Sequence, residues 1–126
     1  MQYSTLSGVR VLVAEDNLIN IEIVRQYLDF LKIKSHFVTD GKQCIASLYN
    51  NSYDCILMDI QMPQLDGFQA TYQIRMIPEL KDLPIIGLSA GFSESDRMKC
   101  IQSGMNDFLI KPFELEELAK TLMKYC

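Results

Sequence analysis

Short apolar runs alternate with amphipathic stretches along the whole chain, and this alternation limits the fold more than any other feature. Five of the runs are apolar on consecutive positions, as is typical of parallel strands covered on both faces. They span residues 9–14, 34–38, 54–58, 84–88 and 106–110. Repeated strand–helix units join parallel strands by right-handed crossovers. The sequence therefore predicts an α/β fold, a five-stranded parallel sheet with helices on both faces.

The stretches between the runs carry helical signals. Asn17 is placed to cap a helix whose apolar residues recur at helical spacing, namely Leu18, Ile21, Val24, Leu28 and Leu31. Ser93 and Asp96 suit a capped helix start, and Gly104 suits a left-handed stop. The last helix has one apolar face, formed by Leu115, Leu118, Ala119 and Leu122.

Chain length and net charge limit the domain count and the classes of function that the chain can have. The 126 residues fit one domain, which we place at residues 9–126 after a short linker remnant at 1–8. The net charge of −4 and the absence of a basic run argue against nucleic-acid binding. No apolar run approaches the roughly 18 residues needed to cross a bilayer, and the N-terminus is too short and polar for a signal peptide. The four cysteines are widely spaced, which favours reduced thiols in the cytosol over a disulfide framework or a zinc site.

Five polar side chains are placed at the carboxyl ends of the predicted strands. They are Glu15, Asp16, Asp59, Ser89 and Lys111. Ligands of open parallel sheets bind beyond this edge. One acid after a strand is usually a cap or a solvated loop residue, but clustered carboxylates repel one another unless a cation binds.

Mg²⁺ suits this cluster because it is a hard ion that takes one or two carboxylates together with waters and phosphate oxygens. With Mg²⁺ bound, an Asp carboxylate can attack phosphorus and become an acyl phosphate. Lys111 and the metal would neutralise the transferred group, and the Ser89 hydroxyl would donate a hydrogen bond. Asp59 is the best nucleophile because it ends the central strand.

Other polar residues have simpler interpretations. Asp54 begins the same strand, roughly 16 Å away at about 3.3 Å per residue, and cannot share the site. Asp66 follows Pro63 at a turn and is interpreted as structural. His36 lies inside the second strand, where a surface or packed role is favoured over metal ligation.

The segments at these strand ends closely resemble the receiver domain of two-component response regulators. The resemblance runs from about residue 9 to the C-terminus, with all segments in the order of the family. It rests on four stretches: Val11-Leu12-Val13-Ala14-Glu15-Asp16-Asn17, Leu57-Met58-Asp59-Ile60-Gln61-Met62-Pro63-Gln64-Leu65-Asp66-Gly67, Ile85-Ile86-Gly87-Leu88-Ser89-Ala90 and Phe108-Leu109-Ile110-Lys111-Pro112-Phe113.

This resemblance implies a doubly wound, flavodoxin-like sheet of strand order 2-1-3-4-5, the order that known members of the family have. It implies that Asp59 accepts the phosphoryl group, that Lys111 holds it, and that Mg²⁺ (or Mn²⁺) binds Glu15, Asp16, Asp59 and the backbone carbonyl of Gln61. Ser89 would move toward the phosphate and let Phe108 turn inward, which reshapes the face of helix four, strand five and helix five. The Lys111–Pro112 bond would be cis.

Some residues depart from the commonest family pattern. Ser89 stands where Thr is commoner, and Phe108 stands where Tyr is frequent, so switching must use ring packing. Ala90 and Gly91 lie next to the expected phosphate. Gln61 and Gly91 occupy positions that tune loss of the phosphate in this family.

The resemblance also implies partners. A phosphohistidine on a histidine kinase or a histidine phosphotransfer domain would be the donor, and Leu18, Ile19 and Ile23 are candidate contacts, although each could equally belong to the core. Asn17 followed by Asn20 is similar to receivers of hybrid sensor histidine kinases. We expect a cytoplasmic domain without membrane contact of its own, which a membrane-anchored kinase could contain, and which is a monomer or a phosphorylation-dependent dimer. As an isolated domain it would catalyse only its own phosphorylation and dephosphorylation.

Three other functions fit the residues less well. An adaptor that is never phosphorylated would have lost Asp59, Lys111 or the acidic pair, and none is lost. A phosphatase of the haloacid dehalogenase type needs a second Asp where Gln61 stands. In a flavodoxin-like flavin carrier, Glu15 and Asp16 would repel the flavin phosphate.

Overall fold

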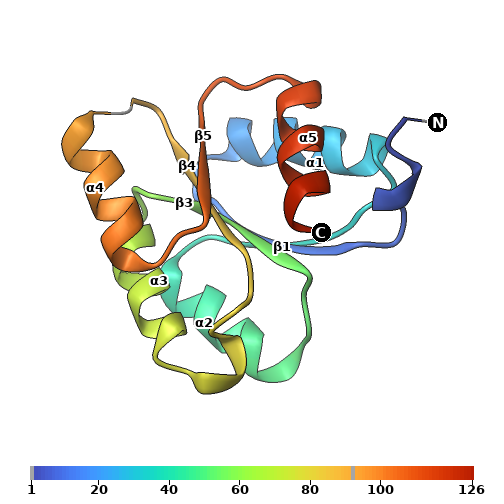
Figure 1. The fold of residues 1–126 in the computed structure, drawn as a ribbon. Coiled ribbons are helices and arrows are strands. Elements are labelled where there is room, and N and C mark those ends of the chain that lie inside the picture. The colour runs from blue at the N-terminus through green and yellow to red at the C-terminus, as the bar shows by residue number, and fades with distance from the viewer. Residues whose placement is uncertain (1, 92) are drawn as a thin grey trace.

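The sheet has the predicted topology. The computed structural model describes residues 2–91 and 93–126, and its five strands are parallel in the order β2-β1-β3-β4-β5 (Figure 1). The strands are β1 (Arg10–Ala14), β2 (Lys34–Val38), β3 (Cys55–Asp59), β4 (Ile85–Ser89) and β5 (Asp107–Ile110). The α-helices are α1 (Leu18–Phe30), α2 (Gly41–Asn50), α3 (Gly67–Arg75), α4 (Glu94–Ser103) and α5 (Leu115–Tyr125). The predicted fold class is confirmed.

Two hydrophobic cores lie on opposite faces of the sheet. Side chains alternate along a strand, so Val11 and Val13 of β1 pack into the core beneath α1 and α5, whereas Leu12 packs into the core against α2, α3 and α4. Figure 1 shows the same division, with α1 and α5 on one side of the sheet and α2 and α3 on the other. Burial on both sides explains why the central strands are apolar on consecutive positions.

The predicted helix starts and stops are confirmed. The Asn17 side chain accepts hydrogen bonds from the backbone N–H groups of Ile19 and Asn20, at 2.9 and 3.1 Å. Ser93 and Asp96 form a reciprocal capping box at the start of α4, and Gly104 ends that helix with φ of 103°. Each cap satisfies backbone groups that the helix itself leaves unpaired.

Several strand predictions need correction. β1 and β5 each begin one residue later than expected, and β3 and β4 are shifted by one residue toward the carboxyl end. Asp59 and Ser89 are consequently the last residues of their strands. The strand at 34–38 is not apolar throughout: Lys34 and His36 are exposed, because β2 is an edge strand that helices cover only in part.

The prediction that Leu18 belongs to the apolar face of the first helix is wrong. Its side chain is 79% exposed, while Ile21, Val24 and Leu28 are buried. Leu18 is the first residue of α1, and it comes four residues after β1 ends at the carboxyl edge of the sheet.

The N-terminal residues contribute to the core. A short 3-10 helix, η1 (Ser4–Leu6), precedes β1, and Leu6 is buried in the cluster that contains α5 residues. The backbone N–H of Gly8 donates to the carbonyl of Lys32 at 2.9 Å. The division of the chain into a linker remnant at 1–8 and a domain at 9–126 stays a prediction.

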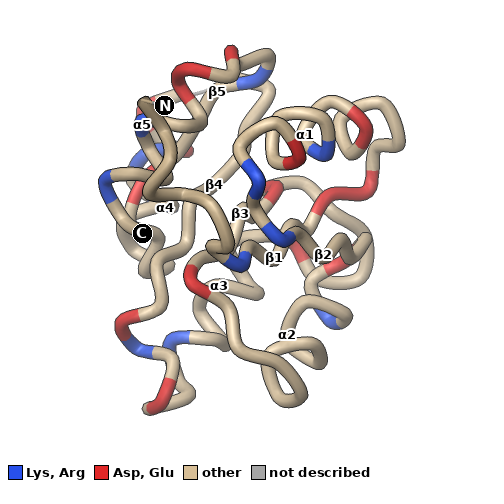
Figure 2. Tube along the Cα trace, turned by 90° about the vertical axis from the view of Figure 1, so that its right-hand side faces the viewer, with Lys and Arg blue, Asp and Glu red and all other residues tan. Residues whose placement is uncertain are grey.

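The surface carries charges of both signs. Lys and Arg are interspersed with Asp and Glu along the chain (Figure 2). Within the described residues, no helix is both long enough and apolar enough to cross a membrane. Cys44, Cys55 and Cys100 are buried free thiols, and Cys126 is an exposed one.

Candidate functional site

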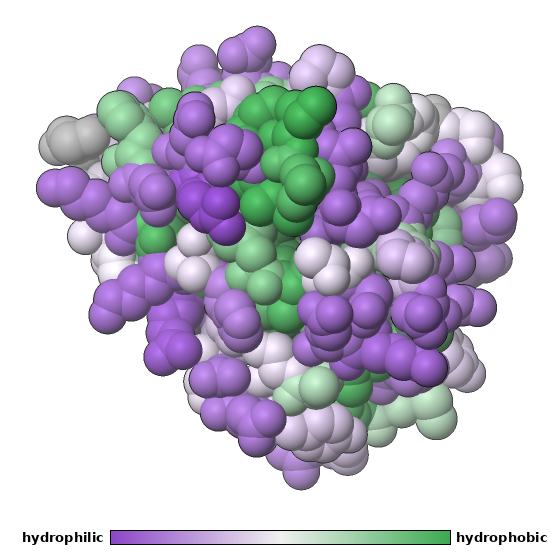
Figure 3. All heavy atoms as spheres, turned by 180° about the vertical axis from the view of Figure 1, so that it is seen from behind, coloured by the Kyte–Doolittle hydropathy of each residue, from purple (hydrophilic) through white to green (hydrophobic). Residues whose placement is uncertain are grey.

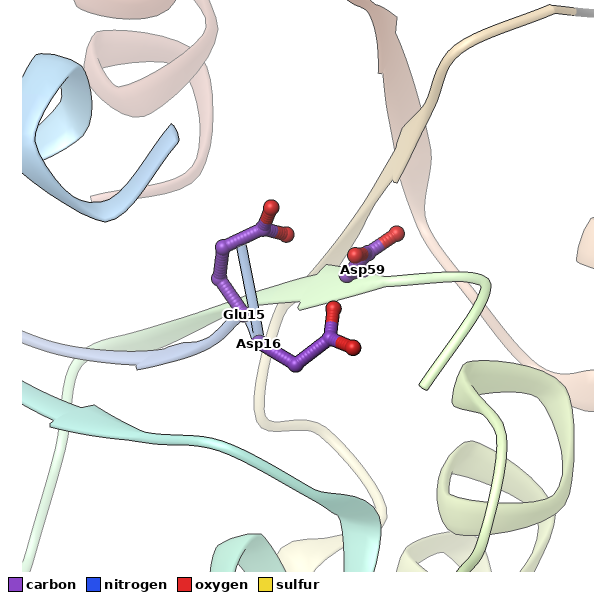
Figure 4. A group of neighbouring side chains, drawn as sticks. All are labelled: Glu15, Asp16 and Asp59. Carbon is purple, nitrogen blue, oxygen red and sulfur yellow. The ribbon is translucent and has the colours of Figure 1, made fainter. Parts of the chain in front are cut away.

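Three carboxylates meet at the carboxyl edge of the sheet. Glu15 and Asp16 follow β1, and Asp59 ends β3, which is the neighbour of β1 in the sheet (Figure 4). One oxygen of each carboxyl group lies within 4.8 Å of the others. Glu15 is fully buried, Asp59 is buried, and Asp16 is exposed to a cleft of about 550 Å³. Adjacent parallel strands thus bring together acids from distant parts of the sequence.

Lys111 is the cation of this cluster. Its Nζ donates to both carboxylate oxygens of Glu15, at 3.1 and 3.0 Å, and lies 3.3 Å from Oδ2 of Asp59. The backbone N–H of Lys111 bonds the carbonyl of Ser89 at 2.7 Å, which ties the residue to the end of β4. The Lys111–Pro112 peptide bond is cis, as predicted. One ammonium group therefore serves two carboxylates.

Asp59 has an unusual electrostatic environment. Burial, together with the hydrogen bond and the like charge of Glu15, raises the pKa of Asp59 to about 7. Lys111 and the backbone N–H of Gln61, which donates to Oδ1 at 3.1 Å, oppose this rise in pKa. A second cation at the cluster would favour the ionised form of Asp59.

The turn after β3 approaches Asp59 closely. Gly67, the first residue of α3, lies so near that a Cβ atom at this position would clash with the carbonyl oxygen of Asp59. Asp66 caps α3 in a reciprocal capping box with Gln69, so its predicted structural role is confirmed. Glycine is required here because any side chain would push the turn away from the site.

Ser89 and its neighbours line the opposite wall. The Ser89 hydroxyl donates to the carbonyl of Gly91, and the Gly91 N–H lies 3.3 Å from the same hydroxyl oxygen. Ala90 and Gln61 also line the cleft. Apart from its chain neighbours, no described atom would lie within 4 Å of a Cβ atom at Gly91, so this position has room for a side chain.

Phe108 lies outside the cleft. It is half-buried, packs against the core on the α4 side, and lines a small cavity of about 140 Å³ between α4 and β5. The structure therefore brings the three carboxylates and Lys111 into one cluster, with Ser89 on the wall of the cleft and Phe108 apart from it.

The residues set aside in the sequence lie elsewhere. Asp54 accepts a hydrogen bond from the backbone N–H of Arg10 at 2.8 Å, at the other end of the sheet. His36 is exposed on β2, and its Nδ1 lies 2.7 Å from the hydroxyl of Tyr53. Neither residue faces the carboxylate cluster.

An apolar surface borders the cleft. Leu18, Ile19 and Ile23 are 79%, 72% and 41% exposed, so all three candidate contacts are at the surface. Figure 3 shows a contiguous apolar area on the side of the molecule that carries α1. We name these three residues the α1 patch.

The contact of Asn20 with the carboxylate cluster does not follow from the sequence patterns. The side-chain amide of Asn20 donates to Oε1 of Glu15 at 2.8 Å. The available signal was its position three residues after the Asn17 cap, which places it on the first turn of α1 and near the end of β1.

Comparison with known families decides what kind of protein carries this site. The model of the response regulator receiver domain matches residues 11–123. The chain belongs to the response regulator receiver domain family. This match bears out the resemblance seen in the sequence.

Curated relatives of this receiver domain are much longer proteins. The peroxide stress-activated histidine kinase mak1 of Schizosaccharomyces pombe is 40% identical over 119 residues, which are 90% of this chain and 7% of the kinase. The transcription factor SKN7 of Saccharomyces cerevisiae is 36% identical over 118 residues, 94% of this chain and 19% of that protein. The receiver domain thus spans less than a fifth of these relatives.

Solved structures share its fold. The receiver domain of sensor histidine kinase PA1611 from Pseudomonas aeruginosa, with a magnesium ion coordinated in its active site cleft, has a TM-score of 0.89 and 39% identity, covering 94% of this chain and 98% of that one. The receiver domain of the response regulator Ssk1, in complex with the histidine phosphotransfer protein Ypd1 of Saccharomyces cerevisiae, has a TM-score of 0.87 and 30% identity, covering 95% and 90%.

Proposed function

We propose that this receiver domain accepts a phosphoryl group on Asp59, in an Mg²⁺-dependent transfer from a phosphohistidine of a partner protein. The observation that carries the proposal is the sharing of Lys111 between Glu15 and Asp59, with Asp16 beside them at the cleft. Three carboxylates and one ammonium group leave a net negative charge at the cluster. A bound metal ion would offset this charge and allow the phosphoryl group to bind there.

The reaction is a nucleophilic displacement at phosphorus. A carboxylate oxygen of Asp59 forms the new O–P bond while the N–P bond of the phosphohistidine breaks, and the electron pair of that bond leaves on the imidazole, which takes up a proton. Lys111 would turn from the carboxylates to an oxygen of the transferred group. The Ser89 hydroxyl would leave the Gly91 carbonyl and donate to another oxygen.

The donor set fits Mg²⁺. Glu15, Asp16 and Asp59 offer carboxylate oxygens within a few ångströms of one another, and Gln61 adds a backbone carbonyl at the cleft wall. Oxygen ligands suit a hard ion, and the same site could take Mn²⁺. When bound, the ion would neutralise charge on the transferred phosphoryl group.

Phosphorylation would act through Ser89 and Phe108. Movement of the Ser89 side chain toward the phosphoryl group would free space near the end of β4, and Phe108 on the neighbouring strand β5 would turn inward. The face formed by α4, β5 and α5 would change shape as a result. The half-buried position of Phe108 beside a small cavity supports such a movement.

The donor would dock at the α1 patch. The complex of a similar receiver with a histidine phosphotransfer protein supports a partner of this kind, and the relatives support a hybrid histidine kinase as the parent chain. Leu18, Ile19 and Ile23 expose apolar surface beside the cleft, where a donor must approach.

Incubation with a small phosphodonor and Mg²⁺, followed by intact mass measurement, tests the central proposal. The wild type should gain one phosphoryl group, and Asp59→Asn should gain none. Asp54→Asn is a matched control, because it removes an acid from the other end of the same strand region, and it should react like the wild type. A phosphoryl group that persists on Asp59→Asn would overturn the assignment.

A further inference from the structure

The side chain of Asn20 holds Glu15 from the helix side. Its Nδ2 donates to Oε1 of Glu15 at 2.8 Å, while Lys111 donates to both oxygens of the same carboxylate. Asn20 is itself fixed, because its backbone N–H bonds the Asn17 cap at 3.1 Å on the first turn of α1. A rigid helix start therefore positions a neutral donor against a fully buried acid.

Lys111 and Asn20 would have different roles during the proposed phosphoryl transfer. In the proposed transfer, Lys111 turns to the phosphoryl oxygens and leaves Glu15. A buried carboxylate without a hydrogen-bond donor is costly, and its oxygens are free to rotate away from a metal. Asn20 carries no charge that would draw it to the phosphoryl group, so it is the partner that stays.

We propose that Asn20 is a positioning residue that orients the Glu15 carboxylate toward the metal site, both in the unphosphorylated protein and after Lys111 has moved to the phosphoryl group. The inference rests on the proposed function, because it assigns Asn20 a role in Mg²⁺ binding and transfer at that same site. Residues that hydrogen-bond a metal ligand generally fix its orientation and strengthen metal binding.

The test is calorimetric titration of Mg²⁺ into metal-free protein. Asn20→Ala should raise the Kd for Mg²⁺ about tenfold, the lower end of what loss of such a partner costs. Gln26→Ala, which truncates an exposed amide on the same helix, should leave the Kd unchanged. An unchanged Kd in Asn20→Ala, with normal binding in the wild type, would overturn the inference and leave the proposed function intact.

A second comparison shows whether Asn20 acts through Glu15. In a Glu15→Ala background, adding Asn20→Ala should change the Kd by less than about twofold, because the group it positions is gone. A tenfold effect that persists in this background would show an independent role and overturn the inference. Failure of the wild type to bind Mg²⁺ would overturn both the inference and the proposed function.

Discussion

A partly buried cation lies at each end of the sheet, and the two cations have different kinds of hydrogen-bond partner. At the amino end, the Arg75 guanidinium donates to the carbonyl oxygens of Gly104 and Leu80, at 3.0 and 2.8 Å, and to the side-chain oxygen of Asn106 at 2.8 Å. The Asn106 oxygen also accepts from the backbone N–H of Ile85 at 2.8 Å. At the carboxyl end, Lys111 faces two carboxylates with a third nearby.

The difference lies in what each cation bonds. Arg75 uses its planar fork of donors on neutral acceptors and so joins the end of α3 to the starts of β4 and β5, with Asp82 as a single acid in its electrostatic surroundings. Lys111 is outnumbered by acids that repel one another. The hydrogen bonds of Arg75 at the amino end therefore have a structural role. At the carboxyl end, the cluster can bind a further cation, and Lys111 can change its hydrogen-bond partners.

We expect the largest effect on the phosphorylation rate from a substitution at the carboxyl end of the sheet. Lys111→Ala should slow phosphorylation by a small donor at least about 100-fold, because it removes a preorganised donor to the transferred group. The measurement is the initial rate by intact mass in Mg²⁺. Lys120→Ala, at an exposed lysine of α5, should react at the wild-type rate. A Lys111→Ala rate within threefold of the wild type would contradict the proposed role.

Breaking the amino end should cost stability without affecting the chemistry. Arg75→Ala removes three hydrogen bonds of a charged donor, and we expect the free energy of unfolding to fall by about 2 kcal/mol in urea denaturation. The phosphorylation rate of the folded variant should stay within twofold of the wild type. A loss of rate that matches Lys111→Ala would remove the distinction between the two ends.

Charge crowding at the carboxyl end predicts a dependence of stability on pH. The folded state raises the pKa of Asp59 to about 7, so it binds an additional proton between about pH 4 and 7. In EDTA, this group therefore stabilises the fold at low pH, and that contribution is lost as the pH rises toward 7 and above. Asp59→Asn should be more stable than the wild type by on the order of 1 kcal/mol at pH 8.

Denaturation of both proteins at pH 5 and pH 8 measures this effect. The advantage of Asp59→Asn should shrink at pH 5, and Mg²⁺ should stabilise the wild type more than the variant. An advantage that is equal at both pH values would show that repulsion among the acids is not its cause.

The smallest expected effect concerns access to the cleft. A Cβ atom at Gly91 has open space around it, so a side chain can begin there, and we expect the long side chain of Gly91→Arg to reach over the phosphoryl site. We expect slower entry of water and a phosphorylated lifetime about threefold longer, equivalent to roughly 0.6 kcal/mol. Loss of the phosphoryl group after removal of donor measures it. An unchanged dephosphorylation rate would contradict the prediction.

Much of the fold could be predicted from local sequence patterns. Strand–helix alternation and caps depend on neighbouring residues, and handedness rules then constrain how the strands connect. For this reason the fold class, the Asn17, Ser93 and Gly104 signals and the gathering of acids at one edge were predicted correctly. Strand limits shifted by a residue because strand ends depend on pairing with other strands.

The sequence by itself determined which chemical groups gather at the carboxyl edge, because parallel strands of known order place their ends together. Only the tertiary structure decided how those groups share partners. The division of Glu15 between Lys111 and Asn20, the turn of the Ser89 hydroxyl toward Gly91 and the exposure of Leu18 all depend on side chains from separate elements meeting at short range. Distances of this kind are set by packing between helices and sheet, and no pattern along the chain records them.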